Sequence, residues 1–227
     1  MNSDRTVIIV AGGAGTRMGA DVPKQFLLLQ GKPILMHTIR VFSSISSIAD
    51  IILVLPELQI DHWSELCKKY DFNIPHTIVK GGETRFRSVS NGLDKVSNLD
   101  ALVAIHDGVR PLISTDVVEN CFRAAALFGN AIPVIKPVES VRLSDNTNSY
   151  PVDRDKVYLV QTPQVFKASI IKRCYEVSWP PSFTDDASVL EFSGENIHLV
   201  EGNRENIKIT TPLDLTIAEV IFNVNSM

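Results

Sequence analysis

A glycine-rich segment near the start of the chain holds the residues whose types and spacing could do chemistry. An apolar run at residues 7–10 leads into it, and the cations Arg17 and Lys24 follow, seven residues apart. Glycines let backbone N–H groups approach a ligand closely, and lysine and arginine neutralise phosphate oxygens. The segment therefore predicts a polyphosphate site. A tight turn with two surface cations is the alternative, because glycine-rich turns alone are weak indicators.

Two common phosphate-binding motifs do not fit this segment. The P-loop motif needs Gly-Lys-Ser or Gly-Lys-Thr directly before a helix, and the segment contains neither. The dinucleotide fingerprint G-x-G-x-x-G needs glycine where Met18 stands, and Gly19 comes one residue late. The spacing therefore argues against a P-loop nucleotidase and against an NAD-dependent oxidoreductase.

The overall composition excludes further classes of protein. A net charge of −4 leaves no basic surface for nucleic acid. The three cysteines include no C-x-x-C pair, and the five histidines form no metal-binding pattern. No apolar run reaches about 18 residues, and the amino terminus has no signal-type apolar stretch. We expect a cytoplasmic protein that binds neither nucleic acid nor membrane.

Short β-branched runs alternate with stretches of helical period along the 227 residues. The predicted strands lie at residues 6–10, 51–55, 101–105, 131–135 and 197–200. The predicted helices lie at residues 33–43, 58–70, 84–96, 114–128, 170–177, 185–192 and 213–224. This alternation is typical of an α/β, Rossmann-like fold with a mostly parallel sheet flanked by helices.

Several predicted helices begin at residues that cap helices well. Ser114 or Thr115 is expected as one N-cap, and Thr184 as another before residue 185. Thr211 followed by Pro212 predicts a third, with proline at the first helical position.

The strand ends indicate where a ligand would bind. In open parallel sheets, the ligand crevice lies beyond the carboxyl ends of the strands. The glycine loop after Val10 and a turn at His106 and Asp107 would both open there. Two motifs that are distant in sequence are therefore expected to meet.

Residues 139–156 depart from the alternating pattern. Short extended runs at 141–143 and 150–152 flank a polar turn at 145–148, which predicts a protruding hairpin. An isolated hairpin is marginally stable in water, and a long polar excursion from a compact domain usually has a function. A solvated surface loop is the alternative.

Six further motifs follow one another along the chain. They lie at residues 81–85, 106–111, 152–154, 161–164, 184–188 and 206–210, after the glycine segment and Pro23-Lys24-Gln25. With these motifs, the chain resembles the 2-C-methyl-D-erythritol 4-phosphate cytidylyltransferase family of nucleotidyltransferases over almost its whole length. The resemblance implies a single cytidylyltransferase domain at residues 1–227.

The resemblance also implies the reaction. Enzymes of this family transfer CMP from CTP to the phosphate of 2-C-methyl-D-erythritol 4-phosphate, giving 4-diphosphocytidyl-2-C-methyl-D-erythritol and pyrophosphate for non-mevalonate isoprenoid synthesis. The nucleophile is a phosphate monoester with a second pKa of about 6, so no serine nucleophile or general base is needed. Arg17 and Lys24 would stabilise charge on the CTP phosphates. Arg154 and Lys208 would orient the incoming phosphate.

The remaining site residues also follow from the resemblance. The implied nucleotide-binding residues are Ala11, Gly12, Gly13, Ala14, Gly15, Thr16, Gly82, Glu83, Ser88 and Asp107. The implied acceptor-binding residues are Arg110, Ser140, Thr162 and Thr184. Taken singly, each polar residue among them could be an ordinary turn, cap or surface residue. Mg²⁺ is expected, held mainly by the CTP phosphates, and the resemblance fixes no protein ligands for it.

Family members form homodimers that exchange arms. By that resemblance, residues 137–157 are a dimerisation arm that carries Arg154 into the partner's site. Glu83 and Ser140 depart from the aspartate and threonine that many members carry. Parts of the glycine segment also resemble ribitol-5-phosphate cytidylyltransferases, which leaves that acceptor as an alternative. A non-catalytic nucleotide-binding module is a second alternative, which would not need Arg154 and Lys208.

Overall fold

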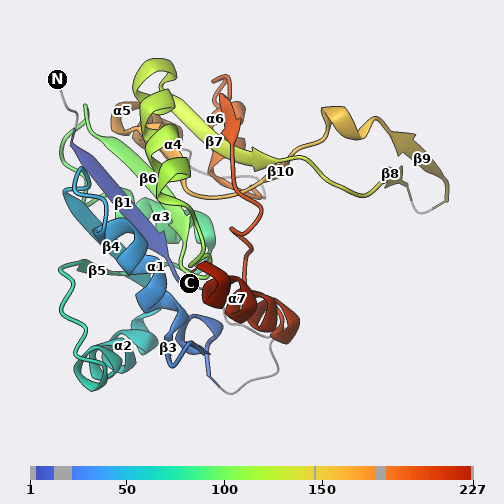
Figure 1. The fold of residues 1–227 in the computed structure, drawn as a ribbon. Coiled ribbons are helices and arrows are strands. Elements are labelled where there is room, and N and C mark those ends of the chain that lie inside the picture. The colour runs from blue at the N-terminus through green and yellow to red at the C-terminus, as the bar shows by residue number, and fades with distance from the viewer. Residues whose placement is uncertain (1–3, 13–21, 146, 177–182, 226–227) are drawn as a thin grey trace.

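The computed structural model describes residues 4–12, 22–145, 147–176 and 183–225, and an eight-stranded sheet forms its centre (Figure 1). The strand order is β10-β7-β11-β6-β1-β4-β5, and β12 pairs with β7 outside this path. The parallel part of the sheet consists of β1 (Arg5–Val10), β4 (Asp50–Leu55), β5 (Thr77–Lys80) and β6 (Leu102–Asp107). Because β4 and β6 lie on opposite sides of β1, the order of the strands reverses between β1 and β6.

The central strands form because their residues are apolar and buried on both faces of the sheet. β1 is buried from Thr6 to its end, and every residue of β6 is buried. Val10 aligns with Val54 of β4 on one side and with Asp107 of β6 on the other. The carboxyl ends of the three strands are therefore level, as a ligand crevice at this edge requires.

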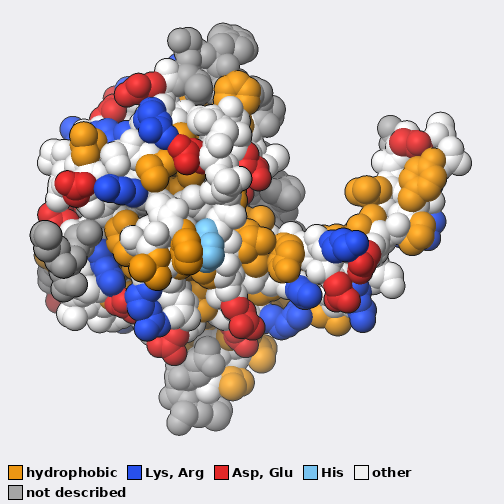
Figure 2. Space-filling view, turned by 90° about the horizontal axis from the view of Figure 1, so that it is seen from above, with side chains coloured by type: hydrophobic (Ala, Val, Ile, Leu, Met, Phe, Trp, Pro, Cys, Tyr) orange, Lys and Arg blue, Asp and Glu red, His pale blue; other side chains and the backbone are white. Residues whose placement is uncertain are grey.

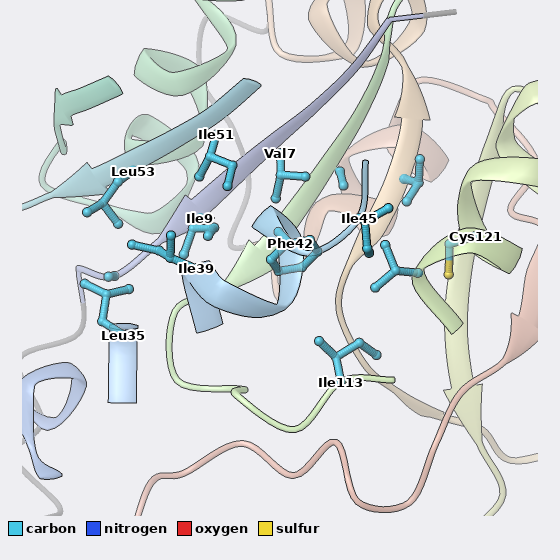
Figure 3. Close-up of a cluster of buried hydrophobic side chains, with 14 of the residues drawn as sticks. Val7, Ile9, Leu35, Ile39, Phe42, Ile45, Ile51, Leu53, Ile113 and Cys121 are labelled. Atoms are coloured by element: carbon cyan, nitrogen blue, oxygen red, sulfur yellow. The ribbon is translucent and has the colours of Figure 1, made fainter. Parts of the chain in front are cut away.

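One face of the sheet is covered by the first, second and fourth helices. These are α1 (Ile34–Ser43), α2 (Glu57–Lys69) and α4 (Thr115–Phe128). Phe42, Trp63 and Phe122 are fully buried in the core beneath them. Figure 3 shows residues of β1 and β4 in this core together with Phe42 of α1.

The opposite face is covered by α3 (Arg85–Leu93), α5 (Ala168–Cys174) and α6 (Asp186–Phe192). A third, smaller core lies beside the carboxyl ends of the strands. There, α7 (Pro212–Asn225) packs against β2 (Leu28–Leu29), which pairs with β3 (Lys32–Pro33). This small core includes Ile209, so it holds in place the segment that carries Lys208.

The other side of the sheet is mixed in direction. β7 (Asn130–Ile135) pairs with β12 (Leu199–Glu201) in parallel and with β10 (Leu159–Val160) antiparallel. β11 (Gln164–Lys167) is inserted between β6 and β7 and runs antiparallel to both. β5, β10 and β11 were not expected from the sequence, because each has at most four residues and no clear alternation.

A two-stranded hairpin extends away from the body of the molecule, as predicted (Figure 1). It consists of β8 (Val141–Ser144) and β9 (Ser149–Val152), and the 3-10 helix η3 (Arg154–Lys156) follows. Asp145 orders the turn by accepting hydrogen bonds from the backbone of Thr147 and Asn148. The apolar side chains of the hairpin are exposed, Leu143 by 65% and Tyr150 by 55%.

The helix starts agree with the sequence in two cases out of three. Ser114 caps α4, and Thr211 caps α7 while the Asp214 carboxylate accepts a hydrogen bond from the Thr211 N–H. The N-cap expected at Thr184 is wrong. Asp185 caps α6 instead, in a reciprocal pair with Ser188, because its carboxylate reaches the Ser188 N–H. The turn expected at His106 and Asp107 is also wrong, since both residues complete β6.

Candidate active site

A pocket of about 230 Å³ lies at the carboxyl ends of β1 and β6, where the strand order reverses. Its lining residues are Val10, Ala11, Gly12, Lys24, Gln25, Gly82, Glu83, Thr84, Arg85, Ser88, Asp107, Val109 and Lys208. Seven of the residues predicted to bind the nucleotide or stabilise its phosphates are therefore brought together: Ala11, Gly12, Lys24, Gly82, Glu83, Ser88 and Asp107. Lys208, predicted to orient the acceptor, also reaches this pocket.

One wall of the pocket combines backbone groups with a cation. Ala11 and Gly12 follow β1 directly, and Lys24 lies on the 3-10 helix η2 (Lys24–Phe26). Gln25 fixes η2 against the strand end because its Nε2 donates to the Ala11 carbonyl at 2.9 Å. The predicted residues Gly13, Ala14, Gly15, Thr16 and Arg17 lie outside the described residues.

A second wall is formed by the loop that leads into α3. Thr84 caps this helix by accepting from the Arg87 N–H, and Ser88 lies one turn further on. The Gly82 N–H donates to Ser88 Oγ at 3.1 Å, and the Ser88 hydroxyl donates to the Thr84 carbonyl. A Cβ at Gly82 would lie 2.4 Å from Arg87 Cβ, so this tight turn requires glycine. The loop backbone is therefore held at the pocket wall.

Asp107 is the electrostatic centre of the pocket. Its carboxylate lies 3.0 Å from Lys208 Nζ and 3.2 Å from Arg110 Nε, and Arg85 Nε lies at 3.9 Å. Burial opposes ionisation of Asp107, but Lys208, Arg85 and Arg110 outweigh it and hold the pKa of this carboxyl well below its ordinary value. Asp107 is therefore ionised and surrounded by three cations from three segments of the chain.

Thr162 and Arg110 are both hydrogen-bonded to Asp107. The Asp107 N–H donates to Thr162 Oγ1 at 3.1 Å, and Arg110 donates to the Asn206 carbonyl at 2.7 Å. His106 Nε2 lies 3.0 Å from the Arg110 carbonyl and therefore carries the proton, so Nδ1 accepts from the Thr162 hydroxyl. This buried chain of hydrogen bonds fixes the backbone around Asp107.

Acid is expected to destabilise the fold through this buried histidine. Burial lowers the pKa of His106 to about 4, whereas histidine in an unfolded chain titrates at about 6.5. The stability that neutral His106 contributes is present above about pH 6.5 and is lost as pH falls toward 4, because the unfolded chain binds the extra proton. Urea unfolding at successive pH values should show a loss of up to about 3 kcal/mol attributable to this residue.

The exposed His62 supplies the control for that experiment. We expect His106→Gln to flatten the pH dependence relative to the unaltered protein, and His62→Gln to leave it unchanged. Burial also lowers the pKa of His37, so some pH dependence remains in the His106 variant. Equal slopes for the unaltered protein and His106→Gln would refute the assignment.

Three predicted acceptor-side residues lie away from the pocket within one chain. Ser140 and Arg154 belong to the base of the arm and are exposed, and Arg154 donates to the Val138 carbonyl at 2.9 Å. Thr184 is exposed just before α6. Sequence reasoning missed Gln25 and Arg85 as lining residues, although both stand inside motifs that carry the family resemblance.

Comparison with known proteins shows which family the chain belongs to. The family model described as "IspD: 2-C-methyl-D-erythritol 4-phosphate cytidylyltransferase" matches residues 6–224. Relatives with that enzyme's name from Bacteroides fragilis and Phocaeicola vulgatus are 53% and 52% identical to the chain. Each alignment covers 96% of the chain and 99% of the relative. The chain belongs to this family.

A solved structure gives the same result for the fold. The 4-diphosphocytidyl-2C-methyl-D-erythritol synthase of Anaerococcus prevotii superposes with a TM-score of 0.84 and 31% identity, covering 98% of this chain and 97% of that one. The predicted α/β fold with a mostly parallel sheet is therefore confirmed, as is the assignment to the cytidylyltransferases, a class of nucleotidyltransferase enzymes. Among the described residues, no helix of this family member is long and apolar enough to cross a membrane.

Proposed function

We propose that this protein transfers CMP from CTP to the phosphate of 2-C-methyl-D-erythritol 4-phosphate, for isoprenoid biosynthesis. The observation that carries the proposal is the pocket at the strand switch point, where the start of the glycine loop, Lys24, Asp107 and Lys208 meet. Family membership favours this acceptor over ribitol 5-phosphate, and it favours catalysis over a non-catalytic nucleotide-binding module.

The proposed reaction is a single in-line displacement. A phosphate oxygen of the acceptor attacks the α-phosphorus of CTP, and the bond from that phosphorus to the β-phosphate oxygen breaks. Its electron pair leaves with pyrophosphate. Because the acceptor phosphate is largely dianionic at neutral pH, no protein group has to remove a proton. The protein's part is to bring two anions together and neutralise the charge that develops.

The cations divide this work between the two substrates. Lys24 and Arg17 are proposed to neutralise the α- and β-phosphates of CTP as the leaving group forms. Lys208 and Arg154 are proposed to orient the acceptor phosphate. Arg110, Ser140, Thr162 and Thr184 are proposed to line the acceptor site. Glycine-loop backbone at residues 11–16 and the Gly82–Ser88 wall, including Glu83, are proposed to hold the nucleotide.

Mg²⁺ is proposed to bind mainly through the CTP phosphates. In the ranges that the structure describes, no group of three or more His, Cys, Asp or Glu side chains could hold a metal ion unaided. The ion would supply further neutralisation of the triphosphate.

We further propose that two chains pair through residues 137–157, each placing Arg154 in the other's pocket. Two observations support this arrangement: the arm exposes Leu143 and Tyr150, and Arg154 does not line the pocket of its own chain. Light scattering at micromolar concentration should give a dimer. A fully active monomer would contradict the exchanged arms. We propose that this dimer acts in the cytoplasm as a single-domain enzyme.

The acceptor is tested by measuring pyrophosphate release from CTP and Mg²⁺. Parallel reactions contain 2-C-methyl-D-erythritol 4-phosphate, ribitol 5-phosphate or no acceptor. We expect rapid release only with the first. Release only with ribitol 5-phosphate would keep the chemistry and overturn the acceptor. CTP binding without release in any reaction would favour the regulatory module.

A further inference from the structure

A buried polar cluster outside the predicted site meets the wall of the pocket. Arg85 donates to both carboxylate oxygens of Asp186, at 2.8 and 2.6 Å. The Tyr175 hydroxyl donates to the same carboxylate at 2.6 Å. Asp186 is fully buried, and the two residues that donate hydrogen bonds to its carboxylate belong to different elements of the fold. Sequence reasoning gave none of these three residues a role.

Arg85 connects this cluster to the pocket. Its side chain is 32% exposed and lines the pocket, and its Nε lies 3.9 Å from Asp107 Oδ1. Arg85 therefore faces the Asp107 carboxylate together with Lys208 and Arg110. Buried ion pairs contribute little net stability, since desolvation offsets their attraction. A role in the neighbouring pocket therefore explains the ion pair of Arg85 and Asp186 better than a contribution to stability does.

The cluster is anchored firmly on both sides. Gln164 of β11 is fully buried, accepts from the Ala187 N–H at 2.9 Å and donates to Asp185 at 2.9 Å. These bonds fix the start of α6, and with it Asp186. The Thr84 cap fixes the start of α3, and with it Arg85. The Arg85 guanidinium is thus held against the start of α6.

Lys208 creates the need for such a fixed charge. Its Nζ lies 3.0 Å from Asp107, yet the proposed reaction requires it to bind a substrate phosphate. If Lys208 turned to a phosphate, the buried Asp107 would lose one of its three cations. An uncompensated buried carboxylate is costly, so another charge must already be in position.

We propose that Arg85, held by Asp186 and Tyr175, is a positioning residue whose fixed charge lets Lys208 leave Asp107 for a substrate phosphate. The inference rests on the proposed function, because it assumes that Lys208 binds phosphate. Arg85 itself does not transfer a group or a proton. It lowers the cost of moving Lys208.

The test removes the charge without leaving an unpaired buried ion. The double variant Arg85→Gln/Asp186→Asn keeps the cluster neutral and hydrogen-bonding. Its control is Arg5→Gln/Glu119→Gln, which removes a 2.7 Å ion pair at the opposite end of β1. For each protein, we would measure kcat, the KM for the acceptor, and the Kd for inorganic phosphate by calorimetry. All measurements are repeated with Asp107→Asn added.

We expect the cluster variant to raise the acceptor KM and the inorganic phosphate Kd about tenfold, with a smaller change in kcat. With Asp107→Asn present, the same change should alter them less than about twofold, because Lys208 is no longer held. The control pair should change neither constant. Unchanged constants, or an equal loss in both Asp107 backgrounds, would overturn the inference.

Two further measurements apply if the double variant does not fold or if the proposed acceptor is not used. If the cluster variant does not fold, Tyr175→Phe replaces it, with an expected rise of about two- to threefold in the same constants. If the unaltered protein does not use 2-C-methyl-D-erythritol 4-phosphate, the proposed function fails. Inorganic phosphate binding then decides the role of Arg85 alone.

Discussion

Replacement of Lys24 by alanine is expected to lower kcat by at least about 100-fold while leaving the fold intact. Lys24 lines the pocket from η2, and the buried Gln25 beside it ties η2 to the Ala11 carbonyl. Because this cation is already in position, its reorganisation free energy is small as negative charge moves toward the leaving pyrophosphate. Losing such a charge affects the transition state more than the bound substrate.

Steady-state kinetics and urea unfolding together test this expectation. Lys32→Ala is the matched control, because Lys32 follows on β3 but does not line the pocket. It should retain near-native kcat. If Lys24→Ala keeps near-native turnover in a folded protein, the role assigned to Lys24 is wrong.

Two inactive variants are expected to restore activity when their chains are mixed. In a dimer with exchanged arms, each site combines the body of one chain with Arg154 from the other. A hybrid of Lys24→Ala and Arg154→Ala chains therefore contains one intact site and one doubly altered site. After unfolding and refolding together, about a quarter of all sites should be intact.

The shape of the chain is the reason for expecting this recovery of activity. The arm extends far from the body, and its apolar side chains face outward (Figures 1 and 2). An isolated hairpin is only marginally stable in water, so burial against a second chain would stabilise it. Recovery is measured as the rate of pyrophosphate release by the mixture, compared with the rate of each variant alone.

A second mixture provides the control. Lys24 and Lys208 line the same pocket of one chain, so every site in a hybrid of Lys24→Ala and Lys208→Ala is damaged. This mixture should stay inactive. Absence of recovery with Arg154→Ala, in chains shown to form hybrids, would contradict exchanged arms.

The sequence predicted the parts of the site that follow directly from a strand. Apolar runs located β1 and β6, and the strand-end rule then placed Gly12 and Asp107 at one edge of the sheet. The hairpin was also predictable, because two short extended runs and a polar turn occur within a few residues. Local patterns of this kind involve neighbours along the chain.

The parts that were missed depend on contacts between distant residues. Arg85 and Asp186 are 101 positions apart, and nothing near either residue indicates the other. β11 has four residues, and its place between β6 and β7 is decided by tertiary pairing. The cap at Asp185 was assigned to its neighbour Thr184 because both residue types suit that position.

Isotope tracing tests the central claim most directly. The acceptor 2-C-methyl-D-erythritol 4-phosphate would carry ¹⁸O in its phosphate, and ³¹P NMR would follow its reaction with CTP and Mg²⁺. We predict a new diphosphate that links the labelled phosphorus to the former α-phosphorus of CTP, together with unlabelled pyrophosphate. Absence of that diphosphate, or transfer of the pyrophosphate group to the acceptor, would contradict attack by the acceptor phosphate at the α-phosphorus.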